Sequence, residues 1–285
     1  MTQHKKQWPI EEMARMLGVA RSGYYKYCNN PPSKRQKENE VLLQTIRAIY
    51  KMSRQTYGSP RIHAELKSQG FKCSRPRVAR IMQKDRIAAK MSRIFKRTTY
   101  VDGRRAVAPN LLQQQFTAVT PNAKWVADIT YVRTHEGWLY VAIVLDLFSR
   151  KVVGLAMGES LHAILVLQAM SQALQRRRPG DGLQHHSDRG CQYTCESFQQ
   201  LLVDNRIECS MSGTGNCYDN AVAESFFHTL KTECIYFERY ESRQHAKQSI
   251  FEYVEVFYNN QRRHSTLGYV SPAEFERRFN QPPCS

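Results

Sequence analysis

Apolar residues in the first third of the chain recur every three or four positions, which is the period of amphipathic helices. The stretch 10–27 (IEEMARMLGVARSGYYKY) predicts a short helix, a tight turn at Gly18 and a second short helix that starts near Ser22. Two short helices around a tight turn are typical of a helix-turn-helix, although an ordinary helical hairpin has the same pattern. We therefore expect a short helix-turn-helix-like segment over residues 1–30.

A second helical block follows the break at Pro31 and Pro32, because proline cannot continue a helix. Three short helices are expected there, and the apolar positions that face inward are Val41, Leu42, Ile46, Ile49, Ile62, Leu66, Val78, Ile81 and Met82. The third helix starts after Ser74, and the basic residues that it turns outward are Arg75, Arg77, Arg80 and Lys84. A basic third helix predicts a helix-turn-helix-like DNA-binding domain over residues 38–90, with a merely solvated basic face as the alternative.

From Lys124 onward the pattern changes to apolar runs that are typical of strands. We expect three antiparallel strands in a row, at 125–131, 138–147 and 151–156. Alternating helices and short strands follow, at 161–177, 183–187, 196–205 and 207–210, and a glycine-rich loop over 211–218 precedes a helix over 220–231 that Asp219 caps. This order predicts an α/β ribonuclease H-like mixed sheet as the catalytic core over residues 121–236, followed by a helical tail over 237–285.

The charge of the chain is concentrated in its first part. The 285 residues include 42 Lys and Arg and 25 Asp and Glu, which gives a net charge of +17. Residues 1–110 hold 25 basic and 7 acidic residues, whereas residues 111–285 hold 17 and 18. A basic module ahead of a charge-balanced domain indicates a polyanionic partner, with nucleic acid as the first candidate.

Residues 91–120 are expected to form a basic linker. Its cations alternate with aromatic residues, an arrangement that can follow a phosphate backbone, although a plain flexible linker is the alternative. The candidate DNA contacts in it are Arg93, Lys96, Arg97, Arg104 and Arg105.

Several classes of protein are excluded. No apolar run approaches the length of a membrane span, and the N-terminus lacks the apolar core of a signal peptide. Eight cysteines are too few for a disulfide scaffold of this size, so we expect reduced thiols and a cytoplasmic, nucleoid-associated protein without membrane partners.

Three carboxylates occupy positions of the expected fold that indicate a shared site. Asp128 lies inside the apolar first strand, Asp188 follows the fourth strand, and Glu224 lies in the helix after the glycine-rich loop. These elements are neighbours in such a sheet, so the three side chains can converge, although each alone is more often structural. Phosphodiester cleavage without a covalent intermediate can use two Mg²⁺ ions about 4 Å apart, which a few carboxylates and the substrate phosphate hold.

The residues around these carboxylates resemble the acidic motifs of bacterial insertion-sequence transposases related to retroviral integrases, the DDE superfamily. The matching stretches are 125–131 (WVADITY), 186–193 (HSDRGCQY), 216–227 (NCYDNAVAESFF) and the tail 258–272, and 35 residues separate Asp188 from Glu224. The chain is similar over residues 40–279 to the OrfB-type transposases of insertion sequence family three. Long, ordered matches of this kind are far more specific than a single short motif.

The resemblance implies an enzyme that cleaves DNA at element ends and transfers the resulting 3′-hydroxyl to another phosphate. Asp128, Asp188 and Glu224 would be catalytic and would hold two Mg²⁺ ions, for which Mn²⁺ may substitute. Lys231 and Asn220 lie on the same helix face as Glu224. Lys231 would contact DNA, and Asn220 would contact either the DNA or the residues that surround the carboxylates. For two residues of the tail, Arg262 and His264, both a DNA contact and a structural role remain open.

The resemblance also implies partners. They are double-stranded DNA at the element ends and at the target, further copies of the chain in a homo-oligomer, and an upstream-frame OrfA product or an OrfA–OrfB fusion. Two other functions remain as alternatives, a catalytically silent DNA-binding regulator and a plain nuclease of the same fold. Zinc is not expected, because the spacing of Cys191 and Cys195 differs from that of zinc sites.

Overall fold

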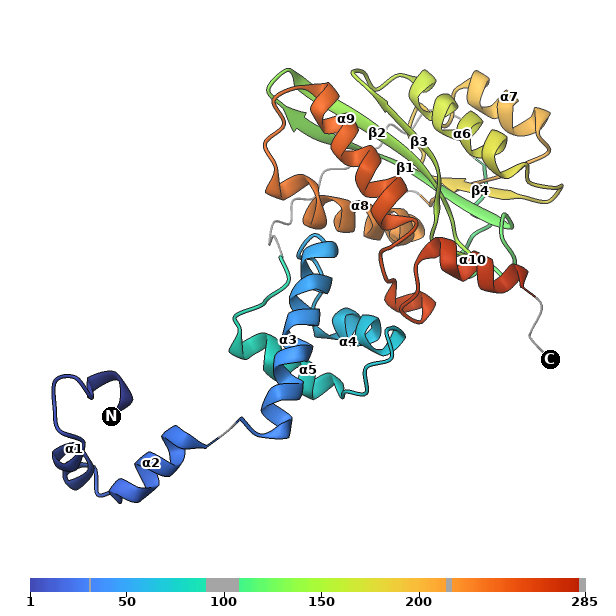
Figure 1. Cartoon of the computed structure of the whole chain (residues 1–285). Coiled ribbons are helices and arrows are strands. Elements are labelled where there is room, and N and C mark those ends of the chain that lie inside the picture. Colours follow the sequence, from blue (N-terminus) through green and yellow to red (C-terminus); the bar gives the residue numbers. More distant parts are fainter. Residues whose placement is uncertain (31, 91–107, 214–216, 282–285) are drawn as a thin grey trace.

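The computed structural model in Figure 1 describes residues 1–30, 32–90, 108–213 and 217–281. Five of the expected DNA contacts therefore lie outside the described residues, and these are Arg93, Lys96, Arg97, Arg104 and Arg105. Within the described ranges, no helix is both long enough and apolar enough to cross a membrane.

Strand β1 (Lys124–Thr134) is the centre of a five-stranded sheet with the order β3-β2-β1-β4-β5. On one side, β2 (Gly137–Asp146) and β3 (Val152–Gly158) are antiparallel and follow through short turns. On the other side, β4 (Gln184–Ser187) and β5 (Glu208–Met211) run parallel to β1 and are reached through helices, as parallel crossovers require. The predicted ribonuclease H-like mixed sheet is thereby confirmed.

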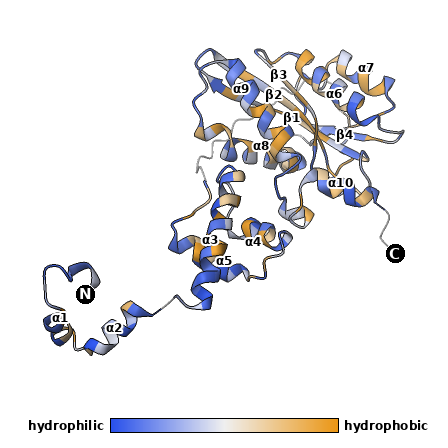
Figure 2. Ribbon diagram, viewed as in Figure 1, coloured by the Kyte–Doolittle hydropathy of each residue, from blue (hydrophilic) through white to orange (hydrophobic). Residues whose placement is uncertain are grey.

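Helices cover both faces of this sheet, as Figure 1 shows. Helix α6 (Ala163–Arg177) packs on β2 and β3, and α7 (Glu196–Asp204) lies beside it. A Cβ atom at Gly154 of β3 would lie 2.1 Å from the carbonyl oxygen of Ala169, so only glycine permits this close approach to α6. On the other face lie α8 (Ala221–Glu233) and α9 (Arg243–Phe251). Orange residues in Figure 2 follow the strands and the inward sides of these helices.

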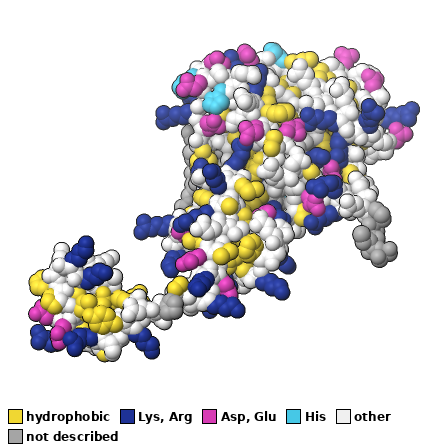
Figure 3. All heavy atoms as spheres, in the orientation of Figure 1, with side chains coloured by type: hydrophobic (Ala, Val, Ile, Leu, Met, Phe, Trp, Pro, Cys, Tyr) yellow, Lys and Arg dark blue, Asp and Glu magenta, His cyan; other side chains and the backbone are white. Residues whose placement is uncertain are grey.

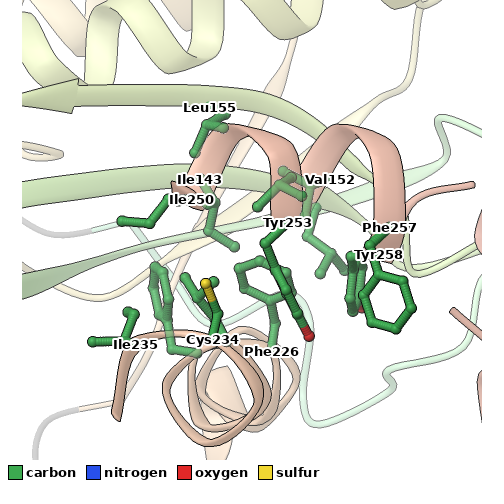
Figure 4. Packing of buried hydrophobic residues seen from close by; sticks show 14 of the residues in the cluster. Ile143, Val152, Leu155, Phe226, Cys234, Ile235, Ile250, Tyr253, Phe257 and Tyr258 are labelled. Atoms are coloured by element: carbon green, nitrogen blue, oxygen red, sulfur yellow. The ribbon is translucent and has the colours of Figure 1, made fainter. Parts of the chain in front are cut away.

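The C-terminal tail is part of the core of the sheet. Its π-helix η4 (Glu252–Tyr258) continues α9 and buries four large side chains, which are Tyr253, Val254, Phe257 and Tyr258. Figure 4 shows Tyr253, Phe257 and Tyr258 packed between α8 and the strand residues Ile143 and Val152. Helix α10 (Pro272–Asn280) then ties the tail to the rest of the core through ion pairs of Arg177 with Glu276 and with buried Asp146. The short helical turns are η1 (Thr2–His4), η2 (Cys217–Asn220), η3 (Ile235–Phe237) and η5 (Ser265–Leu267).

The N-terminal part is helical, as predicted. Helices α1 (Ile10–Met16) and α2 (Arg21–Asn29) form the first pair. The second block contains α3 (Lys34–Met52), α4 (Ser59–Ser68) and α5 (Arg75–Lys84), and a capping box between Ser33 and Gln36 starts α3. Eight of the nine expected inward positions are buried or half-buried, but the placement of Val41 was wrong, since 57% of its surface is exposed. The buried residues of α3 to α5 join the same cluster as the α8 side of the sheet.

Candidate active site

Strands β1 and β4 separate at the point where the first two carboxylates lie. They pair only from Lys124 to Val126, opposite 184–186, and Asp128 comes two residues beyond this pairing. Asp188 follows the last residue of β4 directly. The fold therefore places these two carboxylates at one opening between two parallel strands, as the sequence predicted. Such an opening at the carboxyl ends of parallel strands is a common position for ligands.

The electrostatics of Asp128 and Asp188 show that they share this opening. Burial, the negative charge of Asp188 and, to a smaller extent, that of Glu224 together raise the pKa of Asp128 to about 8. The Ile129 N–H opposes this rise by donating to Asp128 Oδ1 over 2.8 Å. Burial also raises the pKa of Asp188, against a 3.0 Å hydrogen bond from the Gly190 N–H. Without a cation, this site disfavours two ionised carboxylates.

Glu224 lies in the first turn of α8, and its side chain is exposed. Its negative charge contributes to the raised pKa of Asp128. Among the residues that the structure describes, no three His, Cys, Asp or Glu side chains form a complete set of metal ligands. The donors nevertheless fit a hard divalent cation, because two neighbouring half-buried carboxylates offer oxygen ligands and a cation would relieve their repulsion.

The start of α8 is fixed to the sheet by Asn220 rather than by Asp219. Asn220 is the N-cap residue, and its side-chain N–H donates to the carbonyl oxygen of Ala127 over 3.1 Å, one residue before Asp128. The prediction that Asp219 caps α8 was wrong. Asp219 is buried and accepts hydrogen bonds from the Gly213 N–H over 2.8 Å and from Asn110 over 2.9 Å, so it anchors the loop before the helix. Asn220 is buried as well, which places it behind the carboxylates rather than on the surface.

Lys231 lies two turns of α8 beyond Glu224 and remains close to the acidic residues. Its charge lowers the pKa of Asp128, and its Nζ atom lies 5.6 Å from the ring centroid of Tyr131. The ammonium group therefore lies close enough to the carboxylates for its charge to act on Asp128.

The other end of α8 is held by a buried ion-pair network centred on Glu233. Arg262 donates two hydrogen bonds to its carboxylate, over 2.7 and 2.6 Å, and the Tyr253 hydroxyl donates a third over 2.8 Å. Arg61 of α4 adds an ion pair at 3.2 Å. These cations hold the pKa of Glu233 below its usual value, although burial opposes them. The network joins the helical block, the helix that carries Glu224, and the tail.

This network decides between the two roles that the sequence left open for Arg262. Only 3% of its surface is exposed, and its guanidinium is occupied by Glu233, so in this structure it is structural and not a DNA contact. His264 is half-buried against Tyr258, with its Nδ1 atom 2.9 Å from the Thr266 hydroxyl. Burial and the charge of Arg262 lower the pKa of His264 to about 4, so it is neutral near pH 7. It is therefore a poor partner for phosphate.

The basic residues of α5 differ in their surroundings. Arg75, Arg80 and Lys84 are exposed, as predicted. Arg77 is half-buried and bonds Asn39 over 2.9 Å and Glu38 over 3.0 Å, so its predicted outward position was wrong. Figure 3 shows Lys and Arg side chains spread over the surface of this helical part.

Two buried residues beside the carboxylates, Tyr193 and His185, were not predicted as site residues from the sequence. The hydroxyl of Tyr193 is buried with no hydrogen-bond partner among the described residues, and it lies within reach of the charges of Asp128 and Asp188. His185 of β4 packs against it, with ring centroids 6.1 Å apart, and burial lowers the pKa of this histidine to about 3. The sequence alone does not show that these two residues are buried beside the carboxylates.

Comparison with known protein families and relatives agrees with this architecture. A family model described as an integrase core domain matches residues 118–217, a second one of the same description matches 205–272, and an HTH-like domain matches 36–95. The chain is 44% identical to the "Insertion element IS600 uncharacterized 31 kDa protein" of Shigella sonnei, over 94% of this chain and 99% of that protein. It is 42% identical to "Transposase InsF for insertion sequence IS3A" of Escherichia coli strain K12, over 96% of both.

Among solved structures, a chain of the simian T-cell lymphotropic virus intasome in complex with the PP2A regulatory subunit B56 gamma is 14% identical, with a TM-score of 0.47. The alignment covers 78% of this chain and 72% of that chain.

Proposed function

Because the chain belongs to the IS3 family of insertion-sequence transposases, we propose that it cleaves and joins DNA at the ends of its own element, with Asp128, Asp188 and Glu224 as the catalytic, metal-binding carboxylates. The observation that carries this assignment is the meeting of Asp128 and Asp188 where β1 and β4 separate. A strand interior holds a carboxylate at such a position only when something compensates its charge. A divalent cation provides that compensation, and Mg²⁺, with Mn²⁺ as a substitute, suits an all-oxygen donor set.

Each residue has a separate role in this chemistry. When bound, a pair of divalent cations supplies an activated oxygen nucleophile and stabilises the leaving oxygen of the phosphodiester. Asp128 and Asp188 provide the fixed donors, because each is held by a backbone N–H of the following residues. Glu224 completes the set from the exposed side, and Lys231 offers a cation to the phosphate. Asn220 maintains the distance between α8 and β1.

Double-stranded DNA is the substrate that the rest of the chain favours. The HTH-like block carries exposed Arg75, Arg80 and Lys84 on its third helix, and such cations bind phosphates by releasing counterions. We further propose that several copies assemble on the paired element ends, and that an OrfA product or an OrfA–OrfB fusion supplies additional DNA recognition.

The assignment is tested by strand cleavage and joining on a labelled duplex that carries the native element end, with Mg²⁺ or Mn²⁺. Asp188→Asn should abolish both reactions while the affinity for the duplex is kept, because the carboxylate serves the cation and not DNA binding. Asp181→Asn is the matched control, since Asp181 is an exposed aspartate whose ion pair with Arg206 lies on the surface.

The outcomes separate the competing functions. Unchanged joining by Asp188→Asn would show that the site is wrongly assigned. Cleavage without joining would indicate a plain nuclease. Binding without cleavage by the wild-type chain leads to the same assay with the OrfA–OrfB fusion, and inactivity there as well would indicate a catalytically silent regulator.

A further inference from the structure

Two large aromatic side chains stand side by side on the open part of the sheet. Tyr131 of β1 is 40% exposed and Trp138 of β2 is 44% exposed, and their ring centroids lie 5.1 Å apart at an interplanar angle of 85°. Both belong to the face that α6 covers further along, because they alternate in register with buried Ala127 and Ala142. Single exposed apolar residues are ordinary, but an exposed pair of the two largest polar-tipped aromatics is typical of a binding surface.

The pair lies on the same stretch of β1 as the first carboxylate. Tyr131 follows Asp128 by three residues, about 10 Å along the strand, and the two side chains point to opposite faces of β1 beyond its pairing with β4. Lys231 bridges the two places, because its Nζ atom lies 5.6 Å from the Tyr131 ring and its charge also acts on Asp128.

The surroundings of the pair are cationic. Arg133 is exposed and lies directly opposite Trp138 in the strand register. The two carboxylates at this end of the sheet, Glu136 and Glu159, are both bound by Arg243, at 2.8 Å through its backbone N–H and at 3.2 Å through its guanidinium. The cations next to the rings are Arg133, Lys231 and Arg243, whose Nε donates to the Trp138 carbonyl oxygen over 3.1 Å, and they complement phosphate.

We propose that Tyr131 and Trp138 form a stacking platform for an unpaired DNA base beside the cleavage site, with Lys231 and Arg133 holding the adjoining phosphates. Exposed aromatic rings between cations bind unpaired nucleotides, because every base has a π-face that stacks without sequence preference. In a fully paired duplex those faces are hidden by neighbouring base pairs. The platform thus binds strand ends that are frayed or released near the cleavage site. This proposal rests on the proposed DNA-cleaving function.

The test measures DNA binding by the full chain in the presence of a chelator, so that no cleavage occurs. Two probes are compared, a blunt duplex of the element end and the same duplex with a short unpaired 3′ extension that contains 2-aminopurine. The wild-type chain should bind the extended probe more tightly and quench its fluorescence. Trp138→Ala should lose about tenfold in affinity for the extended probe, keep its affinity for the blunt one, and leave the 2-aminopurine unquenched.

Two further variants distinguish the loss of the aromatic face from a general loss of folding in Trp138→Ala. Trp138→Phe retains an aromatic face and should keep most of the preference. Phe251→Ala removes an aromatic residue of similar exposure from α9 and should change neither affinity.

Three results would overturn the platform. One is an equal loss of affinity for both probes in Trp138→Ala, and another is an unquenched extension in the wild-type complex. The third is a change of oligomeric state in Trp138→Ala without any change in DNA affinity, which would make the rings a protein contact. If the wild-type chain shows the expected binding but neither it nor the OrfA–OrfB fusion cleaves when Mg²⁺ is added, the proposed function fails while the platform stands.

Discussion

Asp128 occupies a strand position where an apolar side chain is usual, and its protonation therefore reports on the groups around it. With a pKa of about 8, the folded chain keeps a proton near pH 7 that the unfolded chain, with a pKa near 3.8, has already released. The neighbours that produce this shift, burial first and Asp188 second, are the same features that suit a cation. One residue thus links the stability of the metal-free protein to the chemistry of the site.

The sign of the resulting pH dependence follows from linkage. Between about pH 4 and pH 8 the folded state binds more protons at Asp128 than the unfolded state does, so the free energy of unfolding falls as the pH rises. Asp128→Asn removes this loss of stability at high pH, because asparagine has no proton to release. The melting temperature of the metal-free variant should therefore exceed that of the wild type by about 5 °C at pH 8 and by much less at pH 5. Thermal melts at both pH values check this. Equal differences at the two pH values would contradict it, and Mg²⁺ should raise the wild-type melting temperature at pH 8 more than that of the variant.

At the scale of elements, α8 is fixed at both ends while it presents Glu224 and Lys231 between them. Asn220 bonds its start to β1, and Glu233 anchors its end to Arg262 and Arg61. The helix therefore cannot shift along the sheet without breaking buried polar contacts. This explains how one exposed carboxylate can keep its position relative to two half-buried ones.

Removing the charge of Glu233 should be far more damaging than removing that of an exposed glutamate. Glu233→Gln leaves the buried guanidinium of Arg262 without a countercharge, which should cost about 3–5 kcal/mol in the free energy of unfolding. Glu252→Gln is the matched control, because its partner Arg54 also links the helical block to the tail but the carboxylate is 60% exposed. We expect the control to change by at most about 1 kcal/mol in urea unfolding. Similar losses in the two variants would show that burial of the network contributes little.

For the whole molecule, charge and catalysis lie in different parts of the chain. The net charge of residues 1–110 is strongly positive, and the acidic opening lies in the charge-balanced remainder. The two parts are nevertheless packed together, since α3 to α5 share one buried cluster with α8 and the tail. Deleting the helical block would therefore expose core residues as well as remove cations, so charge substitutions test DNA binding more cleanly.

Replacing Arg75, Arg80 and Lys84 by glutamine should weaken DNA binding uniformly across sequences and make it less dependent on salt. Each phosphate contact that is lost should lower the slope of log K against log [salt] by about 0.9, so the triple variant should lose up to about 2.7. Binding titrations at several salt concentrations measure the slope, and Arg77→Gln serves as the comparison because Arg77 is already bonded to Asn39 and Glu38. A slope that stays at the wild-type value in the triple variant would place the phosphate contacts elsewhere.

The order of strands and helices could be predicted from the sequence because each element carries its own apolar period and its own turn signals. The places of Asp128 and Asp188 could be predicted because Asp128 lies inside an apolar strand and Asp188 directly follows another strand. The burial of Arg262, the anchoring role of Asp219 and the packing of the tail could not, because each depends on contacts between residues far apart in the chain. Val41 was misplaced for a related reason, since the helical period allows a wider apolar face than the packing uses.

The contribution of the tail to the core has a consequence for biosynthesis. Ribosomes release the chain from its N-terminus, so the basic helical block emerges first and can meet DNA while the remainder is still being made. The sheet face behind Asp128 stays uncovered until Tyr253, Phe257 and Tyr258 have left the ribosome. A nascent or prematurely terminated chain that lacks these tail residues is therefore expected to bind DNA without cutting it, because the core around the carboxylates is complete only once the tail has been made.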